Sequence, residues 1–318
     1  MTGVGTVGSW GAGPDRLAQA LAQGEAATTE VDRSAGYHRP DGASRACLVE
    51  KGQLGEWLSP LESRRMSPPS KMAVAASRMA MRCAGLPGKD EAGTATVVST
   101  AFGPSTNTEG LMQQILSEGP ESASPSLFSE SVANAPAAQI AIGCKATGPS
   151  LTVCQREAGS LLALGSAAAE VAAGRARRAL AGSVDEVTPL LHALLDRFDA
   201  LARRSPGGEE VARPFDRRRD GFLVGEGATV VVLETEEGLR ERGGRALARV
   251  LAWGSAFDPS APVSSWGTGH ESLARHLLRT LRRAGLAPGD VDLIVSGASG
   301  SREGDRLEGR VLRTAWGD

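Results

Sequence analysis

PFDRRRDGFLVGEGATVVVLE, residues 214–234, is the most informative stretch of this 318-residue chain. Its last part, Thr229–Leu233, is entirely β-branched or apolar, which is typical of a strand buried on both faces. The arginines and aspartates before it belong to a polar region over residues 201–219, which we interpret as an excursion from the core rather than a domain linker. The stretch therefore predicts a central strand that is entered from a charged loop.

On both sides of this stretch, segments typical of strands alternate with segments typical of helices. The other expected strands are residues 4–7, 94–99, 151–154, 180–182, 248–255 and 291–295. The expected helices are residues 15–23, 65–82, 108–116, 135–142, 159–178, 270–284 and 304–315. This alternation predicts an α/β fold with mainly parallel strand pairing. It also suggests two related parts, residues 1–245 and a much shorter 246–318.

Composition excludes several classes of function. The formal net charge is −2, so no global basic field points to nucleic acid. The four cysteines and four histidines show neither C-x-x-C nor H-x-x-x-H spacing, so we expect no metal site, and the cysteine usage suits a reducing cytoplasm. No apolar run reaches the length of a membrane span, and no signal peptide opens the chain.

The chain opens with a G-x-G-x-x-G pattern at Gly3, Gly5 and Gly8. In a dinucleotide site, a strand precedes the first glycine and a helix begins at the last one. Only two residues precede Gly3, so we expect a short strand over Val4–Val7 instead of a nucleotide loop.

Residues 148–160, GPSLTVCQREAGS, run from an expected strand into an expected helix. A turn of this kind presents a side chain at a helix N-terminus, where negative charge is favoured. Glu157 occupies the apex of the turn, and Cys154 lies three residues earlier on the strand. For Cys154 the simpler interpretation is a small buried residue. Glu157 is either a capping carboxylate or a functional group.

Five segments together resemble the β-ketoacyl synthase family, in order and along almost the whole chain. They are residues 2–9, 131–142, 148–153, 214–234 and 285–294. The resemblance implies a thiolase-like αβαβα layered fold of two related halves, of which the second is incomplete in this sequence. It also implies dimers that pair through the strand before the nucleophile, here Leu151, Thr152, Val153 and Cys154.

The chain departs from the family at its catalytic positions. Active members read Thr-Ala-Cys-x-x-Gly at the turn, whereas alignment from Gly148 places Glu157 at the nucleophile position. A carboxylate does not replace the thiol that forms an acyl thioester. The family's first catalytic His corresponds to Gly297, and its second His and its Lys fall beyond Asp318, where this sequence ends. No residue is therefore identified as catalytic, and we expect no independent condensing activity.

The replacements are similar to those of the chain length factor, a subunit of type II polyketide synthases with Gln-Ala-Gly-Gly at the turn. Here residues 157–160 read Glu-Ala-Gly-Ser. Residues 108–120 resemble the interface helix that gates the polyketide tunnel in that subgroup. The gating positions correspond to Ser105, Thr108 and Met112, although Met112 also fits an ordinary place in a helix core.

The resemblance implies a non-catalytic subunit that pairs with an active ketosynthase. Together they would enclose a polyketide or polyene chain carried on the phosphopantetheine of an acyl carrier protein, in the cytoplasm, without a cofactor, a metal, nucleic acid or a membrane. The alternatives are a malonyl-carrier decarboxylase or other acyltransferase that uses Glu157 as a base, and a degenerate scaffold. Two arginine groups fit either an acidic carrier protein or a solvated surface with Asp216 and Asp220: Arg175, Arg177 and Arg178, and Arg213, Arg217, Arg218 and Arg219.

Overall fold

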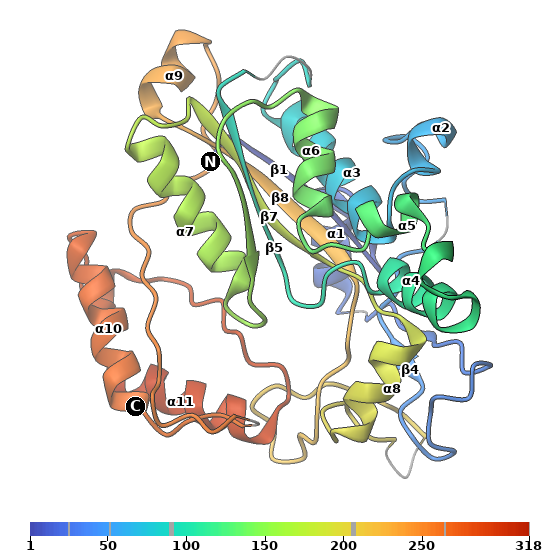
Figure 1. Ribbon diagram of the computed structural model, residues 1–318. Coiled ribbons are helices and arrows are strands. Elements are labelled where there is room, and N and C mark those ends of the chain that lie inside the picture. The colour runs from blue at the N-terminus through green and yellow to red at the C-terminus, as the bar shows by residue number, and fades with distance from the viewer. Residues whose placement is uncertain (25, 51, 89–91, 205–207, 264, 318) are drawn as a thin grey trace. The chain divides into compact units, whose positions relative to one another are not determined.

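The computed structural model describes residues 1–317 except residues 25, 51, 89–91, 205–207 and 264 (Figure 1). The chain forms two compact units that are each built from several segments. Unit 1 comprises Met1–Thr29, Ala46–Thr188 and Gly225–Arg249. Unit 2 comprises Glu30–Arg45, Pro189–Val224 and Val250–Asp318.

Unit 1 contains a six-stranded mixed sheet with the order β2-β1-β8-β7-β5-β6. Its strands are β1 (Gly3–Gly8), β2 (Gly11–Ala12), β5 (Thr94–Thr100), β6 (Ser150–Cys154), β7 (Arg178–Asp185) and β8 (Gly227–Glu234). Strand β5 runs parallel to β6 and β7, whereas β8 runs antiparallel to β7 and β1. The expected excess of parallel pairing is therefore wrong. The reason is that the chain leaves β7 at Asp185 and re-enters β8 opposite it, at Gly227, instead of crossing over the sheet.

Helices cover both faces of this sheet. Helices α3 (Pro68–Cys83) and α6 (Ala135–Cys144) lie on one face and α7 (Gly159–Ala172) lies on the other (Figure 1). Because helices flank it on both sides, β5 is buried along its whole length. The remaining helices of unit 1 are α1 (Pro14–Gln23), α2 (Pro60–Ser63), α4 (Ser105–Glu118), α5 (Pro125–Ser129) and α9 (Glu236–Glu241), with a 3-10 turn at Pro120–Ser122.

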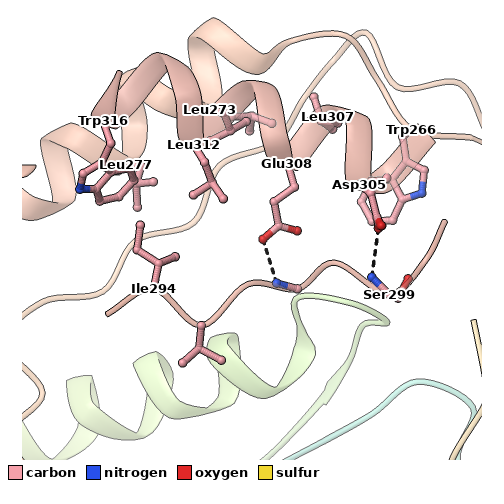
Figure 2. A pocket seen from close by; sticks show the side chains of 14 residues that line it. Trp266, Leu273, Leu277, Ile294, Ser299, Asp305, Leu307, Glu308, Leu312 and Trp316 are labelled. Carbon is pink, nitrogen blue, oxygen red and sulfur yellow. Dashed lines mark hydrogen bonds between the residues drawn. The ribbon is translucent and has the colours of Figure 1, made fainter. Parts of the chain in front are cut away.

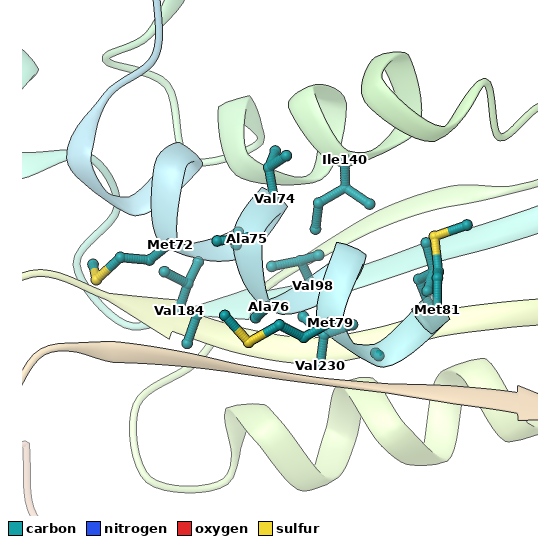
Figure 3. Close-up of a cluster of buried hydrophobic side chains, with 14 of the residues drawn as sticks. Met72, Val74, Ala75, Ala76, Met79, Met81, Val98, Ile140, Val184 and Val230 are labelled. Carbon is teal, nitrogen blue, oxygen red and sulfur yellow. The ribbon is translucent and has the colours of Figure 1, made fainter. Parts of the chain in front are cut away.

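The main core of unit 1 lies between α3 and the sheet. Figure 3 shows Met72 and Met79 of α3 near Val184 and Val230 of the strands, and Val74 of the same helix toward Ile140 of α6. Strand β1 approaches the same helix very closely. A Cβ added at Gly3 would lie 2.1 Å from the carbonyl oxygen of Ala80, and one at Gly5 would lie 2.0 Å from that of Ala76. These glycines therefore permit close helix packing, which accounts for the opening motif without a nucleotide.

Unit 2 contains α8 (Pro189–Arg197), α10 (His270–Arg283) and α11 (Arg302–Trp316), with a 3-10 turn at Pro288–Asp290. The two-residue strands β3 (Thr29–Glu30) and β4 (Arg45–Ala46) pair with each other. The strands expected at residues 248–255 and 291–295 are absent from the structure. Their β-branched and apolar residues favour an extended chain, but the short strands β3 and β4 pair with each other and not with these segments.

The helix expected over residues 159–178 is shorter than predicted. Helix α7 ends at Ala172, and Arg178 is the first residue of β7. Gly174 adopts a φ of 70°, which turns the chain out of the helix, and the amide of Arg177 then bonds to the carbonyl oxygen of Gly93. The sequence had suggested that Arg175, Arg177 and Arg178 lie at the end of this helix. In the structure they lie beyond it.

Candidate functional site

The turn between β6 and α7 presents Glu157 to solvent. Cys154 ends β6 and is also exposed, so its expected burial is wrong. The reason is that β6 lies at the edge of the sheet and pairs with β5 alone among the described strands. Glu157 does not cap α7, because Ala158 stands at the N-cap and no side chain bonds there. Glu157 is thus exposed in the turn before α7 and does not act as its cap.

Helix α7 begins against the sheet at Gly159. A Cβ at this position would lie 2.1 Å from the Ser99 hydroxyl oxygen on β5. A larger residue at position 159 would require the Ser99 side chain to move. Glycine lets the start of α7 lie close to β5 directly after the turn from β6.

The edge of β6 joins an apolar surface. Leu151 is 47% exposed on the strand, and the two helices that contact β6 expose Ile142 and Leu161. An unpaired strand edge beside exposed apolar side chains is typical of a surface that another chain covers. The surface formed by β6, Ile142 and Leu161 is called the edge surface below.

The predicted gating residues share one face of α4. Ser105, Thr108 and Met112 are separated by three and four residues, so their side chains follow one side of the helix. The Thr108 hydroxyl donates to the carbonyl oxygens of Pro104, at 2.9 Å, and Ser131, at 3.1 Å. Met112 is 45% exposed, so its alternative role as a core residue is wrong.

Two acidic residues that the sequence analysis did not single out hold the connection into α4. Asp185 accepts hydrogen bonds from the Thr100 hydroxyl and the Ala101 amide, both at 2.8 Å. Glu186 accepts from the amide of Thr106, at 2.9 Å, and from its hydroxyl, at 2.6 Å. Burial raises the pKa of both carboxyls, although these hydrogen bonds oppose that rise. The available sequence signal was a pair of adjacent carboxylates directly at the end of a buried strand.

Gly297, at the position of the family's first catalytic His, lies in unit 2. It lines a mostly apolar pocket of about 380 Å³ between α10, α11 and the segment 294–299 (Figure 2). The amide of Gly297 donates to Glu308 at 2.8 Å, and the amide of Ser299 donates to Asp305 at 3.0 Å. A Cβ at Gly297 would meet only the Glu308 carboxylate, at 3.4 Å. Packing around position 297 therefore does not require glycine in place of the family's histidine. Glu157 belongs to unit 1 and Gly297 to unit 2.

Three of the candidate carrier-binding arginines have local acidic partners. Arg175 lies 2.8 Å from Glu170, Arg218 lies 3.3 Å from Asp216, and Arg219 lies 3.8 Å from Asp305. The prediction that Asp216 serves as a local partner is confirmed. Within the described residues, no group of three or more His, Cys, Asp or Glu side chains is arranged to hold a metal ion, and none of the helices is long and apolar enough to cross a membrane.

Comparison with known proteins gives consistent results. A model of the "Beta-ketoacyl synthase, N-terminal domain" matches residues 1–238. The "3-oxoacyl-[acyl-carrier-protein] synthase 2" of Mycobacterium bovis is 29% identical over 263 residues, which are 82% of this chain and 63% of that protein. The chain thus spans less than two thirds of the length of this relative.

Solved structures agree on the fold. "The ishigamide ketosynthase/chain length factor" is 30% identical with a TM-score of 0.82, over 100% of this chain and 77% of that one. "AntDE:AntF (apo): type II PKS acyl-carrier protein in complex with its ketosynthase bound to the hexaketide" is 22% identical with a TM-score of 0.81, over 100% and 77%. The mixed α/β sheet with helices on both faces is the thiolase-like arrangement that the sequence predicted. The chain belongs to the β-ketoacyl synthase family.

Proposed function

We propose that this chain is a non-catalytic, chain-length-factor-like subunit that pairs with an active β-ketoacyl synthase. The observation that carries the proposal is Glu157 at the nucleophile position, exposed between β6 and α7. A carboxylate there cannot form the acyl thioester of a condensing enzyme. The similarity to a structure described as a ketosynthase and chain length factor supports the same assignment.

The edge surface is the proposed site of pairing. A second chain that adds a strand beside Leu151–Cys154 would satisfy the outer backbone groups of β6 and cover Ile142 and Leu161. The partner would bring the nucleophile and the imidazoles, and both chains would enclose the growing polyketide or polyene chain. Ser105, Thr108 and Met112 on α4 would line the passage that limits its length.

The proposed substrate is an acyl chain on the phosphopantetheine of an acyl carrier protein. A structural neighbour is described as a type II carrier protein in complex with its ketosynthase, which supports this kind of partner. We also propose that residues 1–245 and 246–318 correspond to the two halves of the family's fold. The match of the N-terminal domain to residues 1–238 supports the first of these.

The second candidate is a decarboxylase or acyltransferase that uses Glu157 as a base. The relative from Mycobacterium bovis carries the name of an enzyme, which favours retaining this alternative. A carboxylate acts as an efficient base when an apolar pocket desolvates it. Glu157 is exposed instead, so the non-catalytic role is the stronger proposal.

Co-expression with a full-length ketosynthase tests the proposal. We expect a one-to-one complex in analytical ultracentrifugation and condensing activity only when both chains are present. Leu151→Arg should weaken the complex at least about tenfold, equivalent to about 1.4 kcal/mol. Leu21→Arg on α1, where Leu21 is 73% exposed, is the matched control and should have no effect.

The variant Glu157→Gln separates the two candidates. A non-catalytic subunit should retain full activity of the complex, because the carboxylate takes no part in bond formation. Loss of thioester decarboxylation in this variant would support the enzyme instead. If the wild-type chain binds none of the ketosynthases offered, the subunit proposal is wrong.

A further inference from the structure

Helix α4 depends on a neighbouring segment for the hydrogen bonds at its N-terminus. Pro104 stands at the N-cap and has no side-chain acceptor. Glu186, the residue after β7, replaces the missing cap. Its carboxylate accepts the Thr106 amide at 2.9 Å and the Thr106 hydroxyl at 2.6 Å. The Ser105 amide donates instead to the carbonyl oxygen of Gly103, at 2.9 Å. The first turn of α4 is thus fastened to the end of a central strand.

The connection that precedes α4 is fastened to the same point. Asp185, the last residue of β7, accepts from the Thr100 hydroxyl and from the amides of Ala101, at 2.8 Å, and Phe102, at 3.1 Å. The amide of Gly103, whose φ is 68°, bonds back to the Thr100 hydroxyl at 2.9 Å. The path of the chain from β5 into α4 is therefore set by two adjacent carboxylates.

Glu186 occupies its place at an electrostatic cost. It is only 3% exposed, and burial, together with the charge of Glu226, raises the pKa of its carboxyl. The Glu226 carboxylate already accepts hydrogen bonds from the amides of Val49, at 2.8 Å, and Val187, at 3.0 Å. A buried carboxylate beside a like charge is unfavourable unless its hydrogen bonds compensate. The bonds described for Glu186 go to the first turn of α4.

Apolar packing contributes little to the direction of α4. Leu111 is the buried residue of this 14-residue helix, all of which the structure describes. A helix usually takes its orientation from an apolar face that packs on the core. Here the polar contacts at Thr106 and Thr108 supply much of the constraint.

We propose that Glu186 is a positioning residue that sets the direction of α4 and, through Ser105, Thr108 and Met112, the length of the acyl chain that the complex accepts. This inference rests on the proposed function. Glu186 contacts no substrate in this scheme. It acts through the helix, so its loss should broaden the range of products more than it slows the reaction.

The test compares variants of the full chain in complex with an active ketosynthase. Glu186→Ala removes both hydrogen bonds to Thr106, Glu186→Gln keeps one acceptor, and Thr106→Val removes the hydroxyl while keeping the branched shape. Glu118→Gln, at the exposed far end of the same helix, is the matched control. Product lengths are measured by mass spectrometry, and hydrogen exchange reports the amide of Thr106.

We expect Glu186→Ala to replace the dominant product with a mixture of shorter and longer chains. The amide of Thr106 should exchange at least about tenfold faster, as the loss of a bond to a charged acceptor implies. Glu186→Gln should change the product distribution in the same direction but less, and Thr106→Val should behave like Glu186→Gln. Glu118→Gln should give the products of the wild type.

Two results would overturn the inference while leaving the proposed function intact. One is an unchanged product distribution from a Glu186→Ala complex that forms normally. The other is unchanged exchange at Thr106, which would show that Glu186 does not hold the helix. A wild-type chain that forms no complex would overturn the proposed function and this inference together.

Discussion

At Gly5 the backbone of β1 lies against the backbone of α3, and a single methyl group would meet the carbonyl oxygen of Ala76 at 2.0 Å. Neither partner can yield easily, because both are main-chain segments in the centre of unit 1. Gly3, Gly5 and Gly8 match a nucleotide-binding pattern, but a strand was expected over these residues instead of a nucleotide loop. The structure places all three in β1. The packing reason for the glycines was not accessible from sequence, since it depends on which helix crosses the strand.

We therefore predict that Gly5→Ala destabilises the protein by about 1–3 kcal/mol, as expected when a tightly packed site is overfilled. The midpoint of urea unfolding measures the change. Gly110→Ala is the control, because no atom lies within 4 Å of its added Cβ on α4. Alanine there should be neutral or stabilising by about 0.5–1 kcal/mol. Equal midpoints for the two variants would contradict the close approach of β1 and α3.

Exposure of single residues was the weakest part of the sequence interpretation. Glu157 lies at the turn and Thr108 and Met112 lie on a helix, as expected, whereas Ser105 lies in α4 although the expected helix began at Thr108. The burial expected for Cys154 is wrong, because it depends on which strand forms the edge of the sheet. That order is set by contacts between residues far apart in the chain, such as Asp185 with Gly227.

Among the elements, helices with a local start or stop signal were predicted well. The Ser67 hydroxyl caps α3, and Gly24 ends α1 with a left-handed φ of 65°. These local signals fit the helices expected over residues 65–82 and 15–23. The strands expected at residues 248–255 and 291–295 were predicted wrongly. Strand formation needs a pairing partner, and local composition does not show whether one is present. Alternation also predicted the α/β class correctly, but the parallel pairing that it predicted is wrong for β8, which runs antiparallel to β1 and β7.

Helix α2 illustrates how one short element depends on pH. Glu62 accepts bonds from the Ser59 amide, at 3.0 Å, and from Arg78, at 2.7 Å. These partners, Arg78 above all, lower the pKa of Glu62 from 4.5 to about 2. A carboxyl with a lowered folded pKa stabilises the fold above its unfolded pKa and loses that contribution as the pH falls.

The stability difference between wild type and Glu62→Gln should therefore be largest above pH 4.5 and should disappear as the pH approaches about 2. It will be modest, because the Glu62 side chain is 41% exposed. Unfolding curves between these pH values measure it. Glu56→Gln, from an exposed pair with Arg82, should give a small difference at every pH. A Glu62→Gln difference that is independent of pH would contradict the role of the charge.

At the scale of the whole molecule, the described chain divides into a well-buried sheet and long extended segments. Val291–Val295 exposes Leu293 and Val295 at 78% and 89% and forms no strand. We predict that its amides exchange rapidly with solvent in the isolated chain, whereas those of β5 exchange most slowly. Hydrogen exchange with mass spectrometry measures both. Strong protection of residues 291–295 would show that the segment is paired with another strand, as its composition had suggested.

The central place of β8 has a consequence for synthesis of the protein. Strand β1 is synthesised well before β8, yet Gly3 pairs with Val232 and Val7 with Ala228. The sheet cannot close until β8 has been made, so β1 lacks this partner while the residues between the two strands are translated. Ribosome-bound chains that stop before Gly227 should remain open to protease at residues 3–8, and protection should arrive only when residue 234 has emerged.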